Sequence, residues 1–95
     1  MRQALDGIGF VHKKPGMPTY NVSLSLTRPP GLGDAELVEL LRHAVERAMC
    51  EAIGVAPAGM VVECEAAALE RLETELRSNL EARDGSLGRM IARPI

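Results

Sequence analysis

The sequence predicts an α/β fold of two layers, in which a β-α-β unit is followed by a second, C-terminal helix. Two segments, 20–27 and 60–65, alternate polar and apolar residues in the way that a strand with one buried face does. Two longer segments, 34–53 and 66–83, repeat apolar residues at intervals of three and four, which is the spacing of an amphipathic helix. Strands and helices therefore alternate along the chain.

The 95 residues supply one hydrophobic core, so we expect a single domain. It divides into a leader at 1–18, the β-α-β unit at 19–65 and a helix with a tail at 66–95. The leader is expected to be irregular because two glycines and the run Lys-Lys-Pro-Gly-Met-Pro interrupt it. At most, residues 8–12 form a short edge strand.

The segment 20–27 is the clearest strand. One face carries Tyr20, Val22, Leu24 and Leu26, and the other carries Asn21, Ser23, Ser25 and Thr27. The second face is polar but uncharged, which suits a surface that meets a cavity or another sheet better than a fully solvated one. Two prolines and two glycines in the next six residues end the strand.

The helix at 34–53 has recognisable ends. Asp34 is placed to cap its N-terminus, Gly54 supplies a left-handed residue at its C-terminus, and Pro57 prevents its continuation. Because a strand, a crossover helix and a strand form a right-handed unit in nearly all proteins, we expect 20–27 and 60–65 to be parallel neighbours.

The C-terminal part begins with the helix at 66–83. Its apolar stripe is narrow and consists of Leu69, Leu72, Leu76 and Leu80. A stripe of this width either lies on a sheet or pairs with another helix. After the breaker Asp84-Gly85-Ser86, residues 90–92 are expected to form a short closing strand.

Charge and hydropathy exclude several classes of function. The 11 Lys and Arg residues against 13 Asp and Glu give a formal charge of −2, so we expect no nucleic-acid partner, which would need a dense positive surface. We also expect no membrane partner, because no apolar run reaches the roughly 18 residues of a membrane span. The absence of a signal peptide and the presence of only two cysteines favour the cytoplasm.

The small core predicts a homo-oligomer. The chain has one Phe, one Tyr and no Trp, so few large side chains anchor the core. Two strands with one packed face are marginal when isolated. We therefore expect copies of the chain to complete the sheet.

The segment that begins at Pro18 has a distinctive order of residues. Pro18 follows a methionine and opens the first strand, and Arg28 stands ten positions later at the end of that strand. A Gly-Val-x-Pro run at 54–57 then precedes the second strand. Over residues 18–65 this order resembles the tautomerase superfamily of small β-α-β proteins, which assemble as multimers with sites shared between subunits.

The resemblance implies an isomerase acting on small enolisable keto acids. It assigns Pro18 as the acid-base group, through the secondary amine that an N-terminal proline exposes, and Arg28 as the anchor for the substrate carboxylate. Tyr20 and Asn21 belong near the substrate by position alone. A neutral amine near pH 7 requires partial desolvation beside cationic groups.

Pro18 can act in this way only if it becomes N-terminal. In this sequence the nitrogen of Pro18 forms the peptide bond with Met17, so it is an amide without a basic lone pair. Val61 and Val62 also stand where the family has a second arginine. The alternative is a non-catalytic oligomeric subunit, structural or regulatory, in which the leader packs across the sheet and the leucine stripe binds a protein partner. Under this hypothesis, Pro18 only interrupts regular structure ahead of the strand.

We expect no cofactor and no metal ion. His43 and Cys50 lie seven residues apart on the predicted helix, about 10 Å along its axis, which is too far for shared metal ligation. The glycine pair at 31–33 lacks the third glycine and the lysine of a phosphate-binding loop, so it is predicted to be a turn before a helix.

Overall fold

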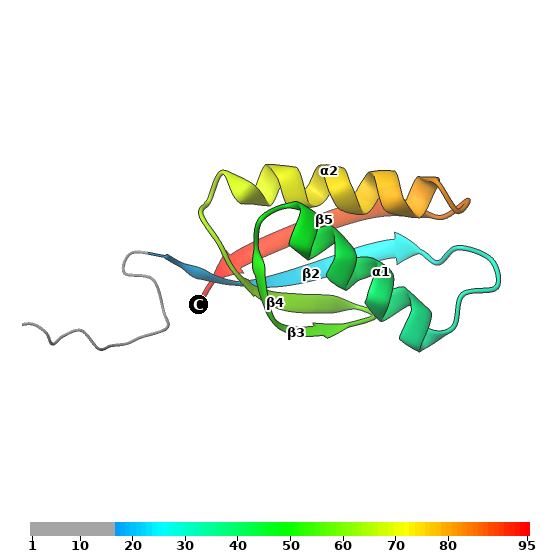
Figure 1. The fold of residues 1–95 in the computed structure, drawn as a ribbon, viewed down its shortest axis with the longest axis horizontal. Coiled ribbons are helices and arrows are strands. Elements are labelled where there is room, and N and C mark those ends of the chain that lie inside the picture. The colour runs from blue at the N-terminus through cyan, green and yellow to red at the C-terminus, as the bar shows by residue number, and fades with distance from the viewer. Residues whose placement is uncertain (1–16) are drawn as a thin grey trace, which may run out of the picture.

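The computed structural model describes residues 17–95, and this part of the chain contains four strands and two helices (Figure 1). In chain order these are β2 (Thr19–Thr27), α1 (Asp34–Arg47), β3 (Glu51–Ala56), β4 (Gly59–Glu63), α2 (Ala68–Glu81) and β5 (Ser86–Pro94). The described strands form one sheet in the order β3-β4-β2-β5. Helix α1 packs over β3, α2 packs over β5, and the helices contact each other. The predicted two-layer α/β class is confirmed.

The connections form two interlocked β-α-β units. Strands β2 and β3 are joined by α1 and run parallel, because each is antiparallel to β4, which lies between them. Strands β4 and β5 are joined by α2 and are likewise parallel, with β2 between them. Each unit therefore inserts one strand into the other, as in the split β-α-β arrangement of ferredoxin-like folds.

The expectation that the strands near 20–27 and 60–65 are parallel is wrong. These strands are β2 and β4, and their register pairs Thr19 with Glu63 and Ser23 with Gly59, in opposite directions. The helix does lead to a parallel strand, but that strand is β3. A tight turn at Pro57 and Ala58 then reverses the chain, so β4 enters the sheet antiparallel.

Helix α1 is shorter than predicted. It ends at Arg47, and Met49 adopts the left-handed conformation (φ 66°) that turns the chain toward β3. The Cys50 N–H still donates to the Val45 carbonyl oxygen (3.0 Å), which secures this last turn. Gly54, predicted to end the helix, lies inside β3 instead.

Helix α2 lies within its predicted bounds, and its leucine stripe is part of the core. Leu72, Leu76 and Leu80 have no exposed surface, and Leu69 is partly buried against the same core. The stripe therefore packs inside the domain and is not a surface for a protein partner. Strand β5 is longer than the predicted 90–92 segment. It pairs with the whole of β2, with a bulge near Gly88 where the register shifts between Ser25 and Leu26.

The core fills the space between the helices and one face of the sheet. Alternate residues of the strands and the inner faces of both helices supply it, among them Tyr20, Val22, Leu37, Leu41, Val45, Met60, Val62, Leu72, Leu76 and Leu80. The predicted leader, with its strand at 8–12, lies outside the described residues except for Met17 and Pro18. No helix within residues 17–95 is long and apolar enough to cross a membrane.

Candidate functional site

The structure places Pro18 and Arg28 at opposite ends of β2. Pro18 precedes the strand directly, and its carbonyl oxygen accepts a hydrogen bond from the Cys64 N–H (3.1 Å). Arg28 follows the last residue of the strand. Because an extended strand rises about 3.3 Å per residue, the two residues are roughly 30 Å apart. One copy of the chain therefore does not bring them together.

The Arg28 side chain is engaged within its own loop. Its Nη1 lies 2.6 Å from Oδ1 of Asp34 and donates to the carbonyl oxygen of Leu32 at 3.3 Å. These contacts close the connection between β2 and α1. Asp34 is the first residue of α1 and not its N-cap, because Gly33 occupies the cap position and its N–H donates to Oε1 of Glu36 (2.8 Å).

Tyr20 and Asn21 lie on opposite faces of β2. Tyr20 is buried among the core residues beneath the helices, and Asn21 is exposed on the other face. Successive side chains of a strand point to opposite sides. The four residues assigned from the tautomerase resemblance are thus not gathered at one place in a single chain.

The two cysteines are neighbours across the β3-β4 hairpin. Glu51 pairs with Glu63, which brings the preceding Cys50 beside the following Cys64. Burial raises the pKa of the Cys50 thiol to about 12, helped by a hydrogen bond with Cys64, while the positive charge of Arg71 acts in the opposite direction. A thiol held in its protonated form is a poor nucleophile.

No described element covers the second face of the sheet. This uncovered face consists of Thr19, Asn21, Ser23, Ser25 and Thr27 from β2, Glu51 and Gly54 from β3, Val61 and Glu63 from β4, and Arg89, Ile91 and Arg93 from β5. The β2 residues at its centre are uncharged, whereas the β3 and β4 side carries two glutamates and the β5 side carries two arginines. Two shallow hollows indent it, one beside Gly88 and one above Gly54 and Gly59.

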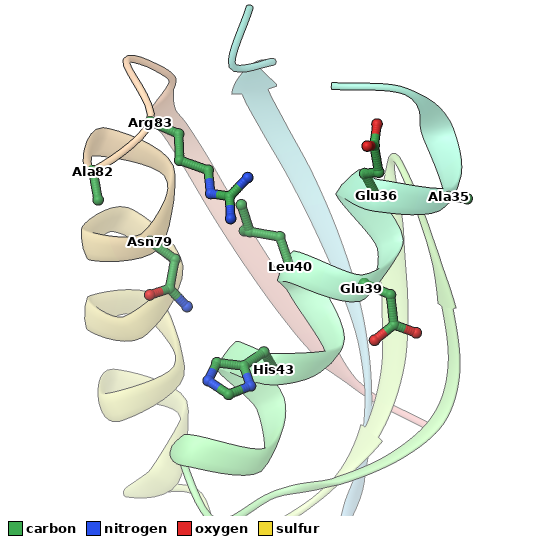
Figure 2. A pocket seen from close by; sticks show the side chains of 8 residues that line it. All are labelled: Ala35, Glu36, Glu39, Leu40, His43, Asn79, Ala82 and Arg83. Carbon is green, nitrogen blue, oxygen red and sulfur yellow. The ribbon is translucent and has the colours of Figure 1, made fainter. Parts of the chain in front are cut away.

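A groove of about 660 Å³ lies on the opposite side of the molecule, between α1 and α2. It is lined by Ala35, Glu36, Glu39, Leu40 and His43 from α1 and by Asn79, Ala82 and Arg83 at the end of α2. Figure 2 shows the side chains of Arg83, Asn79, His43 and Leu40 extending into the space between the helices. The size is within the range of small-molecule sites.

Two polar groups of this groove, one on Asn79 and one on Arg83, have no partner within residues 17–95. The Nδ2 atom of Asn79 is buried without a hydrogen-bond acceptor. Arg83 makes no ion pair with any residue of the described 17–95 range, unlike Arg28, whose partner is Asp34. The sequence gives His43 no role in a small-molecule site, and no local motif singles out Asn79 or Arg83. Nor do residues 17–95 contain any cluster of three or more His, Cys, Asp or Glu side chains that could hold a metal ion.

Comparisons with known proteins give a similarity in structure but no family. No family model matches the chain, and no curated protein matches it. The chain is similar in structure to a domain of unknown function, DUF77, from Bacillus cereus, with 11% sequence identity and a TM-score of 0.49. The similarity covers 87% of this chain and 78% of the other.

Proposed function

We propose that this domain is a non-catalytic, oligomeric subunit that pairs with a second copy of itself through the uncovered face of its sheet. The observation that supports this most directly is the distribution of charge on that face. Glu51 and Glu63 lie on the β3 and β4 side, and Arg89 and Arg93 lie on β5 at the opposite side. The small, uncharged side chains of β2 between them permit close approach of another sheet.

The charge pattern selects one symmetric arrangement. Sheets that pack face to face keep their strands nearly aligned, at an angle of about 30°. A two-fold axis along the strands places β5 of one copy over β3 of the other. Arg93 is level with Asn21 and Glu51 is level with Thr19, an offset of about 7 Å along the strands that two long side chains span. An in-plane axis across the strands would instead place β5 over β5, where the arginines repel. The interface is therefore isologous, with two equivalent Arg93–Glu51 contacts.

The dimension of the face predicts a reversible dimer. With nine residues in β2, the face measures about 30 Å along the strands and roughly 15 Å across them. Two such faces bury on the order of 1,000 Å² in total, which is at the low end for specific interfaces. We expect a dissociation constant on the order of micromolar, so association depends on protein concentration.

The tautomerase hypothesis remains a prediction. It needs a free amine at Pro18 and an arginine from another copy, because Arg28 of the same chain is at the far end of β2. The contacts of Pro18 and Arg28 do not favour it. The proposal of a cytoplasmic subunit is supported by the two neighbouring thiols Cys50 and Cys64, which persist unlinked in a reducing compartment.

Charge reversal on the full-length chain tests the proposal. Sedimentation equilibrium of the wild type should show a monomer–dimer equilibrium, and the single variants Arg93→Glu and Glu51→Arg should each be monomeric. Mixing the two variants should restore a dimer, because each Arg93–Glu51 contact is then present with its charges either native or exchanged.

The matched control pair is Arg42→Glu and Glu46→Arg, two exposed positions on α1 outside the uncovered face. Both controls should dimerise like the wild type, alone and when mixed. A wild type that stays monomeric at about 100-fold the expected dissociation constant contradicts the proposal. So does an Arg93→Glu variant that dimerises as well as the controls.

A further inference from the structure

We propose that the groove between α1 and α2 binds a small carboxylate with a short apolar body, and that Arg83 is the partner of the carboxylate group. Nothing in this proposal depends on dimerisation. The groove lies on the helical layer, whereas the uncovered face lies on the other side of the sheet, so both surfaces are accessible at once.

Arg83 is the arginine best placed to receive an anion in the helical layer. The arginines of the two helices are engaged. Arg77 pairs with Glu73 (2.9 Å), Arg47 with Glu75 (3.3 Å) and Arg42 with Glu39 (3.9 Å), and Arg71 donates to the Ala48 carbonyl oxygen (3.3 Å). Arg83 has no such partner within residues 17–95, and Figure 2 shows its guanidinium reaching over the groove toward Leu40. A planar guanidinium binds a carboxylate through two parallel hydrogen bonds.

Asn79 supplies a second donor in the same groove. Asn79 lies in the last turn of α2 and Arg83 in the turn that follows the helix, and Figure 2 shows both side chains on the side that faces α1. Its Nδ2 is buried and has no acceptor, and Figure 2 shows the side chain directed toward α1. A buried donor without an acceptor costs free energy, and a bound carboxylate oxygen would remove that cost.

The remaining lining fits an apolar body better than a bare inorganic anion. Leu40 projects into the groove, and Ala35 and Ala82 are among the residues that line it. The ring of His43 lies at the other end from Arg83 and offers one further polar contact. A ligand that spans these groups has a charged head at Arg83 and an aliphatic part against Leu40.

The two glutamates of the groove do not oppose this ligand. Figure 2 shows Glu36 and Glu39 pointing away from α2. Glu36 accepts the Gly33 N–H at the start of α1 (2.8 Å), and Glu39 lies 3.9 Å from Arg42. Their charges are thus directed to the far side of α1.

The test is an NMR titration of the full-length, ¹⁵N-labelled chain with sodium butyrate, at constant ionic strength. Butyramide, a neutral molecule of nearly the same shape, and inorganic phosphate are titrated in parallel. Butyrate should produce saturable shifts confined to the ends of α1 and α2 and to the Asn79 side-chain NH₂ signals. For so small a ligand we expect a dissociation constant on the order of millimolar.

The variant Arg83→Gln should weaken butyrate binding at least about tenfold, as loss of a charged hydrogen-bond partner does. Arg47→Gln removes the same charge from the other end of α1, outside the groove, where Arg47 pairs with Glu75 (3.3 Å), and it should change binding less than about twofold. Asn79→Asp, of nearly equal size, places a negative charge beside the ligand and should weaken binding by a similar factor to Arg83→Gln.

Several results would overturn the proposal. Butyramide or phosphate binding as tightly as butyrate would remove the role of the carboxylate or of the apolar body. Equal binding by Arg83→Gln and Arg47→Gln would remove the role of Arg83. Because the backbone spectrum reports folding in the same experiment, a variant that loses its structure is recognised, and Asn79→Asp then decides the outcome.

Discussion

The two faces of the sheet are built by the same strands, yet their side chains differ in burial and polarity. On the face under the helices, Val22 and Val62 are fully buried. On the uncovered face, the adjacent residues Ser23 and Val61 lie among small polar and charged side chains. The period of two in β2 and β4 therefore defines two surfaces, one that forms the core and one that carries small polar and charged side chains.

The sharpest test of this difference uses two neighbouring valines. Val62→Asp places an unpaired carboxylate in the core and should unfold the domain, with a loss of roughly 4 kcal/mol or more in the free energy of unfolding. Val61→Asp, one residue earlier on the uncovered face, should leave the domain folded. Urea denaturation followed by circular dichroism measures both, and similar losses in the two variants would mean that the faces are not distinct.

The second test concerns how closely strands approach. A Cβ atom at Gly59 would lie 2.6 Å from the Val22 carbonyl oxygen, whereas one at Gly54 would meet nothing within 4 Å. Gly59→Ala should therefore lower the free energy of unfolding by about 1–3 kcal/mol. Gly54→Ala should have little effect or stabilise the strand slightly. Equal stability of the two variants would contradict the β2-β4 register.

The smallest expected effect is a dependence of the free energy of unfolding on pH, caused by the Cys50 thiol. Because the folded state raises the pKa of this thiol to about 12 from 9.0, the unfolded chain loses the proton first as pH rises. The contribution of the protonated thiol to stability is complete below pH 9 and declines between pH 9 and 12. Denaturation at pH 8 and pH 10.5 should show a larger loss for the wild type than for Cys50→Ala, and equal losses would contradict the shift.

The sequence predicts those elements whose pattern is local. The alternation from Tyr20 identifies β2, and the regular leucines identify α2. Strand β3 is missed because Ala48, Met49 and Ala52 continue the helical spacing, and a short apolar run fits a helix as well as a strand. Because β3 is missed, the β3-β4 hairpin is missed as well, and β4 is predicted to run in the wrong direction.

The candidate sites were harder to predict for the same reason. Arg89 and Arg93 were not recognised as strand residues because the bulge at Gly88 interrupts the alternation of β5. The groove combines His43 with Asn79 and Arg83, which are more than thirty positions later in the chain. Such pairs are brought together only by the packing of α1 on α2.

The position of β2 also affects how the chain acquires its structure. It is the first described strand, yet its two neighbours are β4 and β5, and the latter ends at Pro94. During synthesis, the edge of β2 that β5 will occupy stays open until the residues of β5 have left the ribosome. Contacts between such distant segments slow folding and make it cooperative. A fragment that stops after α2 would therefore expose an unpaired strand edge, which is prone to aggregation.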